Sequence, residues 1–426
     1  MAVWGAIHAV IFLGLYKLPV RVTSMTYYEL GSDTQHVYWP AVQKLLVGHI
    51  PYVDPHFFVE YPPLGAGFFL LPALLHPTSL RVYDWLFAAE ILAVDLATLP
   101  LIARLALRQR VSAPGAITAY GLLVPFLGSV VSQRYDLVPA MLTLGAILAL
   151  LDRRSVVAWV LLLVATLMKL YPAALVPLFL LYDWRPQLVA TRRRPYWRDA
   201  LRRSRGVVMY AAGLAGSTVA WYLLAPGSLE RFAQWETRRG IELESVFGSV
   251  AELARLGGLA VSRDVAYGSF DVASALTPAL KLLSTALTLG LLAAVYLSYA
   301  RRAPSLPNLS GGKGDSRALV THATLAMLAV LLGSKLLSIQ FLLWLLPLVA
   351  VQAYRPRRVA ALAFVVVLLS QWVYPTSWIS LGRFETAAIF VLALRNLLLV
   401  GLFVALWRNR GTASVSSMSS MSRLGR

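Results

Sequence analysis

The sequence predicts an all-α integral membrane protein, a polytopic helical bundle of about twelve spans. Of its 426 residues 58% are hydrophobic and only 14% are charged, whereas an ordinary soluble domain carries about 25% charged residues. Basic residues gather in short clusters between apolar runs of spanning or nearly spanning length. These runs lie at about 2–17, 82–105, 115–131, 136–151, 155–168, 170–182, 206–225, 276–300, 318–334, 335–353, 358–375 and 386–407.

Two apolar runs need separate treatment. The run at 2–17 lacks the basic N-region and the small-residue cleavage site of a signal peptide, so we expect it to be a retained first span. A further run at 64–75 is too short to cross a bilayer and is bounded by prolines on both sides. We expect an interfacial or re-entrant piece there.

The basic clusters predict the orientation. If the N-terminus is cytoplasmic and 64–75 does not cross, the segment 185–205 with its eight arginines lies inside, as the positive-inside rule requires. If 64–75 crossed, those arginines would lie outside. We therefore expect a multi-pass plasma-membrane protein with both termini cytoplasmic. Its parts would be a single membrane domain at 1–410, extracytoplasmic segments at 18–81 (with short helices) and 226–275, and a flexible cytoplasmic tail at 411–426.

Composition also excludes several kinds of function. The net charge of +19 is explained by topogenic arginines and anionic lipid headgroups, so we expect a lipid bilayer and no nucleic acid as partner. The absence of cysteine excludes disulfides and thiolate sites. The six histidines show no HExxH spacing, which argues against a zinc hydrolase.

On the predicted topology the unusual polar residues all fall on the outer side, and some of them should be recessed. The runs on either side of Lys169 hold 14 and 13 residues, and such helices are only about 20 Å long. A hydrocarbon core is about 30 Å thick, so the Lys169 turn should lie below the surface. Arg134 and Asp136 sit in a similar turn. Charges at that depth normally face a cavity or a partner, so we expect a polar cavity that opens outward.

Each feature also has a simpler interpretation. Asp33 could cap the helix expected at YWPAVQKLL, and Lys169 and Lys335 could extend to headgroups. Glu60 could be an ordinary interfacial charge, and Arg134 could pair with Asp136. Two acidic residues inside the second span, Glu90 and Asp95, could form a structural pair or line the cavity, and the sequence leaves that choice open.

Carboxylates facing outward beside recessed cations suit a lipid-linked phosphate substrate. The cations would hold the phosphate, and a carboxylate would deprotonate an acceptor hydroxyl. The chain has neither a Gly-rich strand-turn-helix pattern nor a DxD site of the kind used by soluble nucleotide-sugar enzymes.

Five ordered motifs resemble glycosyltransferase family 87, whose members are polyprenyl-phosphate-mannose-dependent α-mannosyltransferases, largely of actinobacteria, with the GT-C membrane fold. The similarity spans roughly residues 25–350. The motifs are Gly48-x-x-Pro51-Tyr52-x-Asp54 with Glu60-Tyr61-Pro62-Pro63-Leu64, Arg134-x-Asp136 with Pro139-Ala140, Lys169-Leu170-Tyr171-Pro172, Arg239-Gly240-Ile241-Glu242-x-Glu244-Ser245, and Lys335-Leu336-Leu337-Ser338-x-Gln340-Phe341.

The resemblance implies a hexosyltransferase that moves mannose from a polyprenyl-phosphate donor to a cell-envelope glycolipid or glycan with inversion. It makes Asp33 the catalytic base. Many GT-C enzymes have two carboxylates at this position, whereas this chain has Ser32-Asp33, so we expect no metal and no cofactor. The remaining assignments are donor phosphate binding by Arg134, Lys169, Lys335 and Arg239, and sugar binding by Glu60, Tyr61, Asp136, Glu244 and Gln340.

Other functions remain open at this point. A related transferase could use polyprenyl-phosphate-arabinose or -glucose, or act on a protein hydroxyl. A transporter or flippase of a lipid-linked sugar would place comparable polar residues, although transporters often show inverted repeats and none is visible here. A scaffold in an envelope complex would leave the recessed cations unexplained.

Overall fold

The computed structural model describes residues 1–17, 33–54, 56–189, 197–302, 313–353 and 357–410. These residues form a largely helical bundle, and six of their helices are long and apolar enough to cross a membrane. The prediction of a helical membrane protein is confirmed at this level, and the count of about twelve spans stays a prediction. The helices are α1 (Ala2–Leu13), α2 (Trp39–Leu46), α3 (Pro63–Leu70), α4 (Leu80–Gln109), α5 (Ala113–Leu123), α6 (Val130–Gln133), α7 (Leu137–Leu151), α8 (Ser155–Met168), α9 (Val176–Val189), α10 (Trp197–Leu224), α11 (Ser228–Arg238), α12 (Val246–Leu256), α13 (Thr277–Arg302), α14 (Lys313–Gly333), α15 (Leu346–Ala353), α16 (Arg357–Gln371), α17 (Trp378–Gly382) and α18 (Thr386–Asn409).

Single turns of 3₁₀ or π geometry interrupt the apolar runs. The run predicted at 170–182 begins as a 3₁₀ turn and becomes α9 only at Val176, and the run at 335–353 starts with extended chain before its 3₁₀ turn. Pro172 lies in the first turn of η6, where its missing N–H leaves no helical hydrogen bond unmade. The turns are η1 (Leu15–Lys17), η3 (Thr34–Tyr38), η4 (Leu71–Leu75), η5 (Pro125–Leu127), η6 (Tyr171–Leu175), η8 (Ile339–Trp344) and η9 (Trp372–Thr376).

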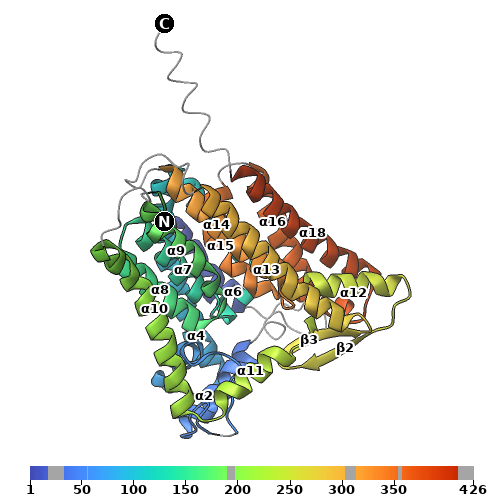
Figure 1. Ribbon diagram of the computed structural model, residues 1–426. Coiled ribbons are helices and arrows are strands. Elements are labelled where there is room, and N and C mark those ends of the chain that lie inside the picture. The colour runs from blue at the N-terminus through green and yellow to red at the C-terminus, as the bar shows by residue number, and fades with distance from the viewer. Residues whose placement is uncertain (18–32, 55, 190–196, 303–312, 354–356, 411–426) are drawn as a thin grey trace.

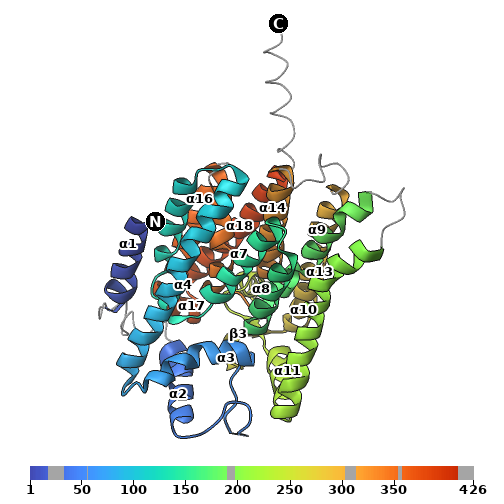
Figure 2. The same cartoon turned by 90° about the vertical axis from the view of Figure 1, so that its left-hand side faces the viewer.

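The short run at 64–75 forms α3 and η4, and Figure 2 shows α3 lying crosswise to the long helices. At the same end of the molecule lie α2, α11 and a small antiparallel sheet (Figure 1). The sheet has the order β1 (Ile241–Glu242), β3 (Ser269–Ser274), β2 (Val261–Ala266). Sequence periodicity did not predict these strands, because each is short and lies in a segment otherwise dominated by helices.

Several residues of the predicted inner loops meet at one end of the bundle. Arg104 pairs with Asp152 at 2.5 Å, and Arg317 Nη2 donates to the Gln109 carbonyl at 2.9 Å. At α18, Arg410 donates to the Ser298 hydroxyl at 3.0 Å. These contacts bring together the ends of α4, α7, α13 and α18, with the beginning of α14. The arginine-rich stretch at 190–196, the loop at 303–312 and the tail at 411–426 lie outside the described residues.

Candidate functional site

Asp33 begins the site at the N-terminal side of η3. It occupies a helix-start position, but its side chain makes no capping hydrogen bond, so the capping interpretation is wrong. The carboxylate instead forms an ion pair with Arg134 and accepts a hydrogen bond from the Tyr61 hydroxyl at 3.0 Å. Both charged side chains are largely buried, with 14% of Asp33 and 15% of Arg134 exposed. The proposed base and a proposed phosphate ligand are therefore direct neighbours.

Asp84 of α4 secures the chain on both sides of the segment that leads to Asp33. The ammonium of Lys17, at the end of η1, forms an ion pair with one of its oxygens, and the Thr34 hydroxyl donates to the other at 3.4 Å. Asp84 is only 1% exposed. Because Thr34 follows Asp33 directly, this buried carboxylate fixes where the proposed base enters the bundle.

Lys169 and Asp136 form the second pair of the site. The ammonium lies 2.5 Å from Asp136, which also accepts a hydrogen bond of 2.7 Å from Trp344 Nε1. Arg134 and Asp136 thus each pair with another segment rather than with each other. Lys169 follows the last residue of α8 and has an extended backbone conformation.

Four aromatic rings surround the Lys169 ammonium. Its nitrogen is 5.0 to 6.0 Å from their centroids, and only 16% of the side chain is exposed, so the interpretation of Lys169 as a headgroup-seeking lysine is wrong. Such rings attract a desolvated cation through their π faces. The rings belong to Tyr61, Tyr135, Phe341 and Trp344.

Glu60 and Arg239 form the third pair, at 3.4 Å. Arg239 Nε also donates to the Tyr267 carbonyl at 2.9 Å, so it connects the segment around Glu60 to the β2–β3 turn. That turn contains Gly268 at φ +69°, and a Cβ there would collide with the Glu60 carboxylate. Burial raises the pKa of Glu60, and the positive charge of Arg239 acts against that shift. Glu60 is therefore a paired, buried carboxylate and not an ordinary interfacial charge.

Lys335 is bound to the protein backbone. Its ammonium donates to the carbonyls of Glu236 at 2.8 Å, Thr237 at 3.3 Å and Arg239 at 3.0 Å, at the C-terminal end of α11. A lysine in this position satisfies carbonyls that the helix leaves unpaired. This excludes the headgroup-seeking interpretation and points to a role in holding Arg239 in place.

The last two motifs form one unit through Glu242. Its backbone N–H donates to the Lys335 carbonyl at 2.9 Å, and its carboxylate accepts from Leu337 N at 2.6 Å and from the Ser338 hydroxyl. The next motif residue, Glu244, is 3% exposed. Burial raises the pKa of Glu244 to about 8, opposed by the charges of Arg395 and Arg134. Gln340 lies in η8, between Ser338 and Trp344 in the sequence, and is half-buried.

All the predicted site residues except Gln340 thus belong to one chain of contacts or electrostatic neighbours. Asp33 and Lys169 both approach Tyr61, while Lys335 holds the backbone of Arg239, which pairs with Glu60. Asp95, in contrast, contacts His8 at 2.5 Å and Tyr120 at 2.8 Å and so joins α1 and α5 to α4. Asp95 is fully buried, and its partners are these two residues rather than Glu90, so the pair of Glu90 with Asp95 is not formed.

Sequence reasoning missed several members of the network. Trp344 and Tyr135 read as ordinary apolar residues, and nothing in their spacing distinguishes them. Asp84 and Arg395 did carry a signal, since each is a charge beside or inside an apolar run.

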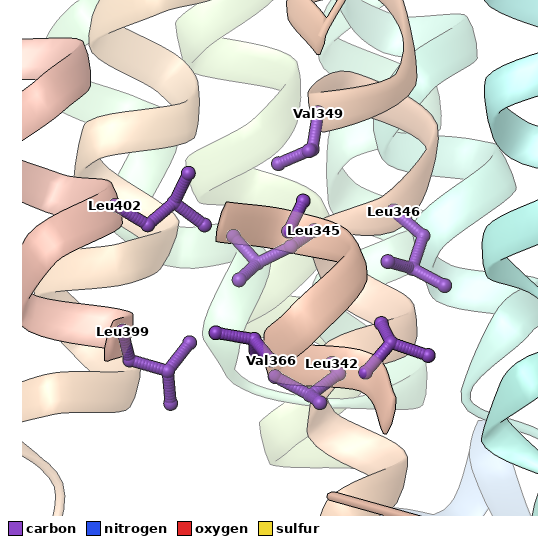
Figure 3. A pocket seen from close by; sticks show the side chains of 9 residues that line it. Leu342, Leu345, Leu346, Val349, Val366, Leu399 and Leu402 are labelled. Carbon is purple, nitrogen blue, oxygen red and sulfur yellow. The ribbon is translucent and has the colours of Figure 1, made fainter. Parts of the chain in front are cut away.

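An apolar cleft lies next to the polar network, between η8, α15, α16 and α18 (Figure 3). Its nine lining residues, among them Leu342, Val366 and Leu402, are all aliphatic, so it offers no group for chemistry. In the part of the chain that the structure describes, no three His, Asp or Glu side chains are grouped so that they could hold a metal ion.

Two comparisons with known proteins bear on this arrangement. The model of glycosyltransferase family 87 matches residues 58–312, more than half of the chain. The match includes Glu60, Arg134, Lys169 and Arg239, and it begins after Asp33 and ends before Lys335. No curated protein matches the sequence significantly.

Proposed function

The chain belongs to glycosyltransferase family 87, and from that membership we propose that it transfers mannose, with inversion, from a polyprenyl-phosphate donor to a hydroxyl of a cell-envelope glycolipid or glycan. The observation that supports this most is the contact between Asp33 and Arg134 inside a network that also holds Lys169. A membrane glycosyltransferase of this kind needs a base and a cationic phosphate site within reach of one substrate. The choice of mannose rests on the five motifs and not on the shape of the site.

In the proposed reaction Asp33 accepts the proton of the acceptor hydroxyl. The acceptor oxygen attacks the anomeric carbon from the side opposite the phosphate, and the bond between that carbon and the phosphate oxygen breaks. Its electron pair stays on the lipid phosphate, which leaves as a stable monoester and needs no protonation. Preorganised cations stabilise the charge that develops on the leaving oxygen.

The ion pairs of the site suggest how the donor binds. Arg134 and Lys169 are neutralised by Asp33 and Asp136. A phosphate entering between the two cations would take over part of each pair, and Arg134 would turn from Asp33 toward the phosphate. That exchange frees Asp33 for the acceptor hydroxyl at the moment the donor is in place. Arg239, held in place by Lys335, completes the cationic side in this proposal, and Glu60, Tyr61, Asp136, Glu244 and Gln340 face the sugars.

We place this site on the extracytoplasmic face of the plasma membrane, with about twelve spans and both termini inside. The segments that build it, around Asp33 and around Arg239, lie at the end of the bundle with α2, α11 and the sheet (Figure 1). The basic residues Arg104, Arg153 and Arg410 belong to the predicted inner loops. The lipid chain of the donor would remain in the bilayer beside the helices.

The test uses purified protein in proteoliposomes with extracted envelope glycolipids as acceptors. Radiolabelled polyprenyl-phosphate-mannose, -arabinose and -glucose are supplied separately, and labelled glycolipid product is measured. We expect product from the mannose donor and none from the Asp33→Asn variant. Movement of label across the vesicle membrane without a new glycosidic bond would replace this proposal with a transporter.

A further inference from the structure

Arg395 is a buried charge inside an apolar helix. It lies nine residues after Thr386, the first residue of α18, which places it about 14 Å along the helix axis. None of the side chain is exposed. An ionisable residue at such a depth is costly and usually serves a functional site.

The partners of Arg395 lie in the turn from β1 to α12. Its Nη2 donates to the Glu244 carbonyl at 3.0 Å and lies 3.5 Å from the Glu244 carboxylate. The neighbouring Asn396 donates through Nδ2 to the carbonyls of Glu244, at 3.3 Å, and Ser245, at 3.1 Å. The Ser245 hydroxyl in turn accepts from Gly248 N at 2.8 Å and so caps α12. One short piece of α18 therefore fixes both the backbone and the side chain of Glu244.

Glu244 connects Arg395 to the polar network. It is an electrostatic neighbour of Arg134, which pairs with Asp33, and its other charged neighbours are Glu242 and Glu252. Arg395 has further capacity for hydrogen bonds, since its Nε and Nη1 have no protein partner. Arg395 therefore lies behind Glu244, one residue removed from the groups that would meet a substrate.

We propose that Arg395 is a positioning residue of the transferase site, which holds Glu244 in the orientation that binds the donor sugar. The inference rests on the proposed function. Glu244 sits in a turn between a two-residue strand and α12, and such a turn by itself does not define the direction of a side chain. Nη2 of Arg395, which donates to the Glu244 carbonyl and also lies beside the Glu244 carboxylate, restricts that direction.

The main test compares Arg395→Gln and Arg395→Lys with Arg408→Gln, an exposed arginine in the last turn of the same helix. We expect Arg395→Gln to raise the KM for polyprenyl-phosphate-mannose by about tenfold or more, with a smaller change in kcat, as loss of a sugar contact does. Binding of polyprenyl phosphate without a sugar should stay within about twofold, because the phosphate contacts are untouched. The KM of Arg395→Lys should lie between those of Arg395→Gln and the unmodified protein, and the KM of Arg408→Gln should match that of the unmodified protein.

The pH profile provides a second readout. Arg395 lowers the pKa of Glu244 against the larger effect of burial, so its removal should move any alkaline limb near pH 8 to higher pH. When Glu244 is already replaced by Gln, the further change Arg395→Gln should raise KM by less than about twofold, because the effects of substituting two contacting residues are not additive. If Arg395→Gln does not fold, Arg395→Lys gives the same comparison with the charge retained.

Two results would overturn the inference. Parallel loss of polyprenyl phosphate binding and sugar affinity would show a general structural role, and unchanged KM and pH profile would show no role. Both require active unmodified protein, so they differ from a failure of the proposed function, in which the unmodified protein forms no glycosidic bond.

Discussion

The guanidinium of Arg134 lies against the carboxylate of Asp33, although about a hundred residues separate them in the sequence. A carboxylate held in this way is a poor base, because the cation stabilises its ionised form. In the proposed mechanism this pair represents the protein before its donor binds, and a phosphate that competes for Arg134 would free Asp33 to act as the base.

Replacing Asp33 by Asn should lower turnover by about 10³-fold, within the range attributed to general bases. Polyprenyl phosphate should bind at least as tightly as before, because Arg134 no longer has a competing carboxylate. Turnover and equilibrium binding in detergent measure the two effects. Asp264→Asn, an exposed carboxylate on β2, is the matched control. Near-normal turnover in Asp33→Asn would remove Asp33 as the base.

Replacing Lys169 by Gln should lower the unfolding free energy by about 3 kcal/mol, because it leaves Asp136 buried without its cation. The double variant Lys169→Gln/Asp136→Asn should recover most of that stability and remain inactive, because the phosphate still lacks its cation. Thermal unfolding and turnover of the purified variants separate the two roles. Equal stability of the single and double variants would show that the pair does not contribute as described.

Glu252 should make the stability of the protein depend on pH. Its side chain is fully buried, both oxygens lack a protein partner, and burial raises its pKa to about 8, helped by the charge of Glu244. Because the pKa of Glu252 is higher in the folded protein than in the unfolded chain, this residue favours folding fully at pH values below the unfolded-chain pKa. That contribution to stability is lost as the pH rises through about 8. Glu252→Gln should therefore unfold at the same temperature as the unmodified protein near pH 5.

At pH 9 the same variant should be more stable than the unmodified protein, since glutamine has no charge to bury. Glu244 changes protonation in the same range, so the pH dependence should become weaker and not disappear. Unfolding temperatures of both proteins between pH 5 and 9 provide the measurement. Curves that stay parallel over this range would contradict the assignment.

Replacing Lys335 by Met should loosen the end of α11 without unfolding the bundle. The ammonium satisfies three carbonyls there, so we expect a loss of about 1.5–3 kcal/mol, the range of hydrogen bonds to charged groups. Faster hydrogen exchange in 228–242, with unchanged exchange in α7 and α8, would locate the effect. Lys281→Met, which changes a lysine of α13, is the control and should leave that segment as it is.

Much of the helical framework follows from apolar run length. The helix at Ser155–Met168 has the predicted bounds, and Leu137–Leu151 differs by one residue. The Ser155–Met168 helix has the 14 residues from which the sequence predicts a recessed Lys169 turn, and the recession itself stays a prediction. The length of an apolar run does not show which of its residues are α-helical. In the run at 170–182, for example, the α-helix begins only at Val176.

Which residues of the site contact one another could not be predicted from the sequence. Asp33 and Arg134 could be recognised as unusual, yet their contact depends on how the chain returns after α3, which no local pattern records. Trp344 gives no sign in the sequence that its indole N–H reaches Asp136. Arg395 is the opposite case, because a charge within the run at 386–407 is visible in the sequence and its partner is not.

The attachment of Lys17 and Thr34 to the same carboxylate, Asp84, has a consequence for how the sequence can vary. Both ends of the stretch at 18–32 are anchored to one point, so the number of residues between them does not determine where Asp33 lies. Insertions or deletions within that stretch should be tolerated, and a short peptide tag placed there should leave turnover unchanged. Loss of turnover with an intact fold would show that the stretch itself takes part in binding. Through Asp84, the protein separates the position of its proposed base from the number of residues between Lys17 and Asp33.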